Sequence, residues 1–137
     1  MSEFLDKVAV VTGAGRGIGN AIAKKLASKG AKIAAISRSV ENSQSCADEI
    51  NSEFPDAAKP YSVDVSNHDA MIDAGKSVLE DFGKVDILIN NAGVTRDNLM
   101  LRMTEEEWDV VLNTNLKGAF NSVKAFQRSL LKQGGAR

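Results

Sequence analysis

Short apolar runs alternate along the chain with longer segments whose apolar positions recur every three or four residues. The first run, residues 7–12, is almost unbroken, which is typical of a strand buried on both faces of a parallel sheet. Runs of this kind predict strands at residues 7–12, 32–37 and 85–90, and a short strand is expected at residues 59–63. The longer segments predict helices at 17–29, from about 40 to 53, at 67–82, from 105 onward, and at about 115–131.

The predicted helices carry end signals and apolar faces. Ser39, Ser66 and Thr104 stand where a side-chain oxygen can cap a helix start. In the first helix Ile18, Ile22 and Leu26 recur every four residues, so we expect them to face the sheet. The last helix has an apolar face that we expect to be shared between the sheet and a second subunit, made of Leu116, Ala119, Phe120, Val123, Leu130 and Leu131.

A glycine-rich turn, residues 12–19 (Thr-Gly-Ala-Gly-Arg-Gly-Ile-Gly), joins the first strand to the first helix. Such a turn lets bare backbone approach an anion, and the helix start offers unpaired N–H groups and a positive dipole end. The usual Gly-x-Gly-x-x-Gly spacing would put a glycine at position 18, where Ile18 stands. The turn predicts a nucleotide phosphate site, and the alternative is a flexible loop.

Alternation of strands and helices at roughly 25-residue spacing favours right-handed crossovers and a parallel sheet. We predict an α/β fold, a Rossmann-type doubly wound sheet with strand order 3-2-1-4, as one dinucleotide-binding domain over residues 1–137. Ligands bind such sheets at the carboxyl ends of the strands, near the point where the strand order reverses. Three further polar or glycine-containing clusters follow strands at that edge: Ser37-Arg38, Asp64-Val65 and residues 90–93 (Asn-Asn-Ala-Gly).

The end of the second predicted strand indicates the cofactor. An acid commonly stands there to bind the ribose hydroxyls of NAD, but this chain has neutral Ser37 followed by Arg38. Arginine can hold a 2′-phosphate in a bidentate pair, and Arg16 in the glycine turn can reach the same region. The pattern predicts NADP(H) rather than NAD(H). The alternative is that both arginines are solvated surface residues.

Composition excludes several classes of protein. Hydrophobic residues make up 43%, charged residues 26%, and the net charge is −1, so no basic surface for nucleic acid is expected. No apolar run reaches transmembrane length, and we expect no membrane contact. The single cysteine, Cys46, indicates a reducing compartment, and a cytoplasmic location is expected. His68 has no second histidine or cysteine near it, so no metal site is predicted.

The glycine turn, Asp64-Val65, residues 90–93 and residues 113–116 (Asn-Thr-Asn-Leu), in this order, resemble the short-chain dehydrogenase/reductase family over almost the whole chain. Residues 93–103 and 106–108 are most similar to the 3-oxoacyl-[acyl-carrier-protein] reductases. The resemblance implies NADPH-dependent reduction of a 3-oxoacyl group on acyl carrier protein, in fatty acid synthesis. Two alternatives stay open: another reductase of this family, acting on a steroid, sugar or small ketone, or a non-catalytic nucleotide-binding module.

The resemblance also implies a role for each matching position. The turn glycines would shape the pyrophosphate site, Asp64 would accept from the adenine amino group, and Val65 would pack on the ring. Asn90 and Ala92 would line the nicotinamide-side ribose, and Asn115 would be the catalytic asparagine whose carbonyl holds a relay water. The predicted cofactor-binding residues are Thr12, Gly13, Gly15, Arg16, Gly17, Ile18, Gly19, Ser37, Arg38, Asp64, Val65, Asn90, Ala92 and Gly93.

One part of the family pattern does not occur in these residues. The family uses a serine and a Tyr-x-x-x-Lys motif, whereas Tyr61 is the single tyrosine here and Val65 stands four residues later. We therefore expect the domain to be incomplete at its C-terminal end and the 137 residues alone to be inactive. The family likeness further implies a homotetramer when complete, and carrier-protein docking at basic residues such as Arg128 and Lys132.

Overall fold

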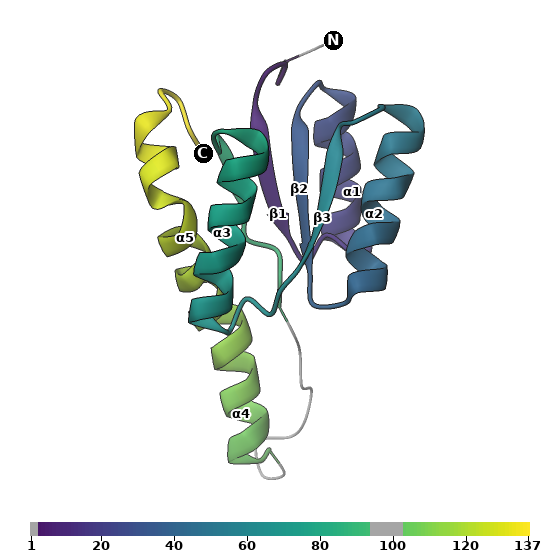
Figure 1. The fold of residues 1–137 in the computed structure, drawn as a ribbon. Helices are drawn as coiled ribbons and strands as arrows, with labels where there is room; N and C mark the ends of the chain where they lie inside the picture. Colours follow the sequence, from purple (N-terminus) through teal and green to yellow (C-terminus); the bar gives the residue numbers. More distant parts are fainter. Residues whose placement is uncertain (1–2, 94–102) are drawn as a thin grey trace.

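The computed structural model describes residues 3–93 and 103–137. Its strands alternate with helices in the predicted order (Figure 1). The strands are β1 (Val8–Thr12), β2 (Lys32–Ser37), β3 (Ala58–Ser62) and β4 (Ile87–Ile89). The helices are α1 (Gly17–Ser28), α2 (Val40–Glu53), α3 (His68–Phe82), α4 (Glu105–Val111), the π-helix η1 (Leu112–Lys117) and α5 (Gly118–Lys132).

The four strands form one parallel sheet in the order β3-β2-β1-β4, which confirms the predicted topology. Val10 of β1 pairs with Ala34 of β2 and with Leu88 of β4, so β1 lies in the middle of the sheet. The strand order reverses beside β1, because β2 and β3 lie on one side of it and β4 lies on the other. Because all four strands are parallel, their carboxyl ends meet at one edge, where the glycine turn also lies.

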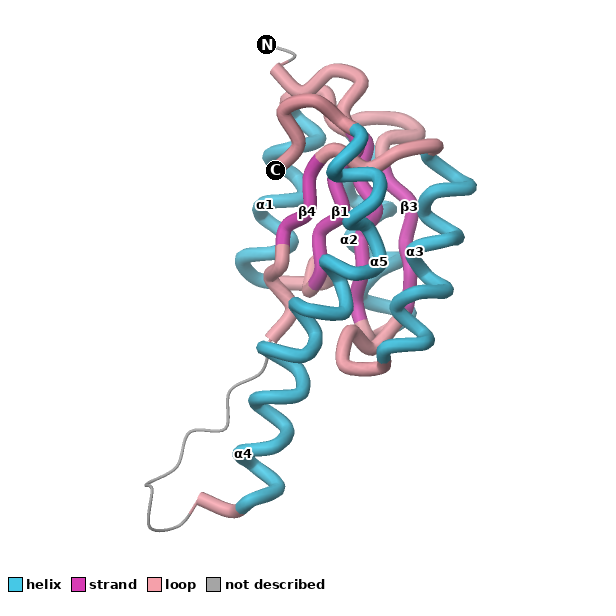
Figure 2. Tube along the Cα trace, turned by 90° about the vertical axis from the view of Figure 1, so that its left-hand side faces the viewer, coloured by secondary structure: helices cyan, strands magenta, loops and turns pink. Residues whose placement is uncertain are grey.

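Helices cover both faces of the sheet, α1 and α2 on one side and α3 and α5 on the other (Figures 1 and 2). Alternate residues of β1 belong to different cores: Ala9 and Val11 pack with α1 and α2, while Val8 and Val10 pack with α3 and α5. Both faces of β1 are therefore buried, as its unbroken apolar run predicts. Helix α4 projects beyond the edge where the strands end (Figure 1).

The predicted inward face of α1 is wrong by one position. Ile18 is 73% exposed, whereas Gly19, Ala23 and Ala27 are the buried residues of the helix. A Cβ atom on Gly19 would overlap the carbonyl oxygen of Gly13. The helix approaches the glycine turn and the sheet so closely that its smallest residues must face inward, and the larger apolar side chains lie at the margin of that contact.

Two helix starts also differ from the prediction. Asn67, not Ser66, caps α3, because its side chain accepts a hydrogen bond from the N–H of Ala70. The segment from 115 does not begin an ordinary α-helix, since residues 112–117 form a π-helix continuous with α4 and α5. The predicted caps Ser39 and Thr104 are confirmed by hydrogen bonds from the N–H groups of Asn42 and Glu107.

The outer edge of β4 is paired with the last residue of the chain. The N–H of Arg137 donates to Asp86 O at 2.9 Å, and the N–H of Leu88 donates to Arg137 O at 2.8 Å. This is the hydrogen-bond pattern of a parallel strand pair, and it places Arg137 beside β4. Within the described residues, no helix is both long and apolar enough to cross a membrane.

Candidate cofactor site

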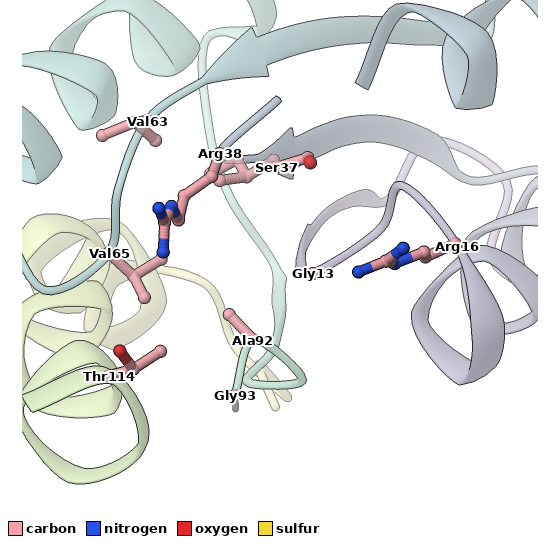
Figure 3. A pocket seen from close by; sticks show the side chains of 10 residues that line it. Gly13, Arg16, Ser37, Arg38, Val63, Val65, Ala92, Gly93 and Thr114 are labelled. Atoms are coloured by element: carbon pink, nitrogen blue, oxygen red, sulfur yellow. The ribbon is translucent and has the colours of Figure 1, made fainter. Parts of the chain in front are cut away.

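A cavity of about 240 Å³ lies at the carboxyl edge of the sheet, beside the reversal point. Its walls come from the glycine turn, the ends of β2 and β3, the loop after β4 and the π-helix (Figure 3). The lining residues are Gly13, Arg16, Ile36, Ser37, Arg38, Val63, Val65, Ala92, Gly93 and Thr114. Segments far apart in sequence thus converge on the place where ligands bind doubly wound sheets.

The glycine turn is held in a conformation that other residues rarely adopt. Gly13 has φ +64°, and a Cβ atom there would lie 2.9 Å from Ala92 Cα. Asn91 Nδ2 donates to Gly13 O at 3.2 Å, which ties the turn to the loop after β4. Neither an acidic residue nor a capping side chain occupies the first turn of α1. The turn therefore presents backbone and an uncompensated positive helix end, which fit a pyrophosphate.

Thr12, the last residue of β1, also holds the loop after β4. Its side chain is buried, and its Oγ1 accepts hydrogen bonds from the N–H groups of Asn91 and Ala92, each at 3.0 Å. The same hydroxyl donates to Ile89 O at 3.3 Å. Thr12 thus fixes the loop after β4 against the end of β1, and its hydroxyl is fully engaged in that task.

Two arginines approach the cavity from different sides. Arg38 extends from the end of β2 toward Val65, whereas Arg16 lies across the cavity beside Gly13 (Figure 3). The Arg38 carbonyl accepts from Ser62 Oγ at 2.9 Å, so the backbone beneath this side chain is anchored to β3. Ser37 lines the cavity between them, and its Oγ accepts from the N–H of Ser39 at 3.3 Å. This rim is cationic where an NAD-binding site commonly carries a carboxylate.

Asp64 and Val65 form the turn after β3. Burial alone would raise the pKa of Asp64, but hydrogen bonds from Ser66 and the nearby Arg38 charge hold that pKa below its ordinary value. Ser66 donates through its hydroxyl at 2.7 Å and its N–H at 3.0 Å, both to Asp64 Oδ1. The carboxylate is therefore charged at neutral pH. Val65 is buried and lines the cavity, while Asp64 lines a neighbouring groove next to Arg38.

Asn115 lies in the π-helix, next to the loop after β4. A Cβ atom on Gly93 would lie 2.8 Å from Asn115 Oδ1, so the two residues are in close contact. A π-helix inserts an extra residue into a helical turn, and such insertions are frequent at functional sites. The preceding residue, Thr114, is buried and lines the cavity.

Most of the predicted site residues come together. The cavity beside the reversal point is lined by Gly13, Arg16, Ser37, Arg38, Val65, Ala92 and Gly93, and Gly15 joins an adjoining cavity with Asn42 and Asn91. The structure places Gly17, Ile18 and Gly19 on the first turn of α1, whereas Asn90 is exposed directly after β4. Among the described residues, no three potential metal-ligating side chains gather.

Sequence reasoning missed several residues that shape this site. Thr114 lies inside the Asn-Thr-Asn-Leu motif of residues 113–116, and its place before Asn115 could have predicted it as a cavity residue. Asn42 and Asn121 carry no sequence signal for a binding site. Asn42 lies inside α2 and does not cap it, and Asn121 lies inside α5 among mostly apolar and charged residues. The segment 94–102, on which the finer family resemblance partly rests, lies outside the described residues.

The comparisons with known proteins agree on one family. A sequence model described as short chain dehydrogenase matches residues 7–137. A curated relative from Vibrio cholerae, 3-oxoacyl-[acyl-carrier-protein] reductase FabG, is 44% identical over 93% of this chain and 50% of its own. The chain spans about half the length of the curated relatives it matches.

Solved structures give the same result. An alcohol dehydrogenase from the archaeon Thermococcus sibiricus, complexed with 5-hydroxy-NADP, superimposes with a TM-score of 0.90 at 40% identity. That match covers 94% of this chain and 55% of the other. An NAD⁺-bound xylitol dehydrogenase superimposes with a TM-score of 0.91 at 36% identity, over 96% and 50% of the two chains. With the parallel sheet, the glycine turn and the Asn115 segment in place, the chain belongs to the short-chain dehydrogenase family.

Proposed function

We propose that these residues form the cofactor-binding half of an NADPH-dependent 3-oxoacyl-[acyl-carrier-protein] reductase of fatty acid synthesis. The observation that carries the cofactor assignment is the rim of the cavity, where Ser37 and Arg38 follow β2 and Arg16 lies opposite. A 2′-phosphate would gain charge-assisted hydrogen bonds there. The substrate assignment draws on the likeness to the relatives that bear this name, one of them 44% identical.

The chain's own residues would divide the binding of the dinucleotide. The glycine turn and the start of α1 would hold the pyrophosphate, with Gly13 and Gly19 providing the space that a side chain would fill. Asp64 would accept from the adenine amino group, and Val65 would cover the ring. When bound, the nicotinamide would supply a hydride for the C3 carbonyl. By family resemblance, Asn115 would hold a water of the proton relay through its main-chain carbonyl.

A second candidate is another reductase or dehydrogenase of the same family, acting on a small ketone, a sugar or a steroid. It is favoured by the solved structures, which include an alcohol dehydrogenase and a xylitol dehydrogenase at 40% and 36% identity. The residues described here form the cofactor side, which these enzymes share. A non-catalytic nucleotide-binding module is the third possibility, and it would bind the cofactor without turnover.

The test uses the full-length protein. Isothermal titration should show NADPH binding at least tenfold tighter than NADH, because two charge-assisted contacts contribute roughly 1.5–3 kcal/mol each before ordering costs. Arg38→Ala should remove most of that preference. The charge-matched control is Lys25→Ala, which removes an exposed lysine of α1. Equal affinities would refute the cofactor assignment. Turnover of acetoacetyl-acyl carrier protein, compared with free ketones and sugars, separates the two enzyme candidates.

The proposal includes a homotetramer of the complete protein. Leu116, Phe120 and Leu131 are 70%, 58% and 85% exposed along η1 and α5, so a large apolar strip faces outward. Soluble monomers rarely leave strips of this kind uncovered. The strip would lie at a subunit interface. Light scattering on the Phe120→Glu variant should then report a smaller particle than the unchanged protein, and a monomeric unchanged protein would refute the proposal.

Carrier-protein docking at Arg128 and Lys132 is part of the same proposal. Both residues are exposed near the end of α5, where cations could meet an acidic partner. Reversing both charges should raise the Michaelis constant for a carrier-linked substrate and leave that for a small thioester unchanged. An unaltered constant for the carrier-linked substrate would refute the docking site.

A further inference from the structure

A polar residue is buried in α5 directly behind the adenosine side of the cavity. Asn121 is 1% exposed, although its neighbours on the helix include exposed Phe120 and Val123. Its Nδ2 donates to the main-chain carbonyl of Val65 at 2.9 Å. Val65 lines the cavity between Arg38 and Thr114 (Figure 3). A helix that only covered the sheet would be expected to place an apolar side chain at this position.

The orientation of the Asn121 carboxamide follows from its partners. A carbonyl oxygen only accepts, so Nδ2 must face Val65, and Oδ1 then faces His68 Nδ1 at 2.9 Å. His68 must therefore carry a proton on Nδ1 and donate it. Both the neutral Nδ1–H tautomer and the charged imidazolium meet this requirement. The carboxamide thus links the Val65 carbonyl to the first residue of α3.

Main-chain hydrogen bonds also hold the backbone on either side of the Asp64–Val65 turn. Val63 N donates to Ser37 O at 3.0 Å, and Asn67 N donates to Asp64 O at 3.0 Å. One helical turn before Asn121, a Cβ atom on Gly118 would lie 2.6 Å from Val65 Cγ2. The helix therefore passes so close to Val65 that the position of α5 sets the position of this wall of the cavity.

We propose that Asn121 is a positioning residue for the adenosine end of the cofactor. Its carboxamide ties Val65 to α5 and holds the Asp64–Val65 turn at the spacing that an adenine ring needs. The inference rests on the proposed function, because it presumes an adenine dinucleotide in this cavity. It assigns no chemical step to Asn121, which reaches the ligand only through Val65.

The test compares ligands that carry different ends of the cofactor, in the whole protein. In Asn121→Leu, which keeps the branched shape of the side chain and removes the donor, Kd for NADPH and for 2′,5′-ADP should rise about tenfold. Kd for reduced nicotinamide mononucleotide, which lacks the adenosine, should not change. Ser129→Ala is the matched control. It removes a buried hydroxyl of α5, 7% exposed and bonded to Val85 far from the cavity, and should change none of the three affinities.

Each outcome is informative. Equal weakening of the mononucleotide and of 2′,5′-ADP would overturn the inference, since it would indicate a general loss of structure. Unchanged affinity in a folded Asn121→Leu would also overturn it. If that variant does not fold, the exposed His68→Ala is used instead, with about a threefold rise expected for 2′,5′-ADP, and no rise is the overturning result. An unchanged protein that binds neither NADPH nor NADH would refute the proposed function itself.

Discussion

Replacing Thr12 by valine tests whether the hydroxyl, rather than the bulk of this side chain, holds the site together. The two residues have nearly the same volume, and Thr12 is 1% exposed, so the change leaves no cavity. It removes the acceptor of two N–H groups, those of Asn91 and Ala92, and the donor to Ile89 O. The loop after β4 would then lose its attachment to the end of β1.

The expected cost follows from these bonds. The Asn91 N–H keeps a second acceptor, Ile89 O at 3.1 Å, whereas the Ala92 N–H loses the acceptor it has in Thr12. A buried donor without a partner costs about 1–3 kcal/mol, and because Ala92 is only half-buried, the lower part of that range applies to it. The lost bonds of the Asn91 N–H and of Ile89 O to the hydroxyl add about 1 kcal/mol, so the total is about 2–3 kcal/mol. The added methyl group returns about 0.8 kcal/mol by its burial. We expect Thr12→Val to lower the free energy of unfolding by about 1–2 kcal/mol.

The matched control is Thr12→Ser, which keeps the hydroxyl and loses the methyl group, at a cost of about 1 kcal/mol. Urea unfolding of both variants and the unchanged protein, at equal protomer concentration, measures the stabilities. NADPH titration measures the site. The valine variant should bind NADPH more weakly, because Ala92 and Gly93 line the cavity, and the serine variant should not. If serine lost as much affinity as valine, the methyl contact would matter rather than the hydroxyl, and our reasoning would be refuted.

Two further predictions concern the glycine turn and a polypeptide of residues 1–137, in which the single tyrosine, Tyr61, has no lysine four residues later. Gly19→Ala should lower both stability and NADPH affinity, since its Cβ would overlap the backbone of Gly13; Gly134→Ala, whose Cβ meets no atom within 4 Å, is the neutral control in the same urea and titration assays. A polypeptide of residues 1–137 alone should oxidise no NADPH with acetoacetyl thioesters and should aggregate in light scattering. Measurable turnover, or a monodisperse monomer, would contradict this.

The strand order could be predicted from the sequence because strands alternate with helices and three of the four strands are short apolar runs. β1 needs apolar residues on both faces, and its unbroken run shows this without any tertiary information. The inward face of α1 could not be predicted in the same way. Apolar periodicity selects large residues, whereas close approach to the glycine turn requires small ones, and Gly19 and Ala23 give little hydrophobic signal.

The cofactor site was predictable where function depends on residues next to one another in sequence. The glycine turn, Ser37-Arg38 and Asp64-Val65 each follow a strand, and the sheet brings these strand ends to one edge. The links between those segments were not predictable. Asn121 meets Val65 across 56 residues, and its burial depends on where α5 crosses α3. A polar residue inside a helix gives the same sequence signal whether it faces solvent or a distant carbonyl.

A surface helix usually turns its apolar face to the core and its polar face to solvent. The segment from the π-helix through the first turns of α5 has the reverse arrangement. The inward stripe is small or polar near the cavity, at Thr114, Gly118 and Asn121, and its large apolar residue, Phe126, lies deeper in the core. Beside the cavity, polar groups meet main-chain groups and glycine permits close approach, so apolar bulk would be unfavourable there. The strongly apolar residues Leu116 and Phe120 therefore lie on the outward stripe. In the proposed homotetramer, these outward residues would meet a second copy of the chain. The same helix would thus fix the adenosine wall of the site and hold the proposed subunit interface.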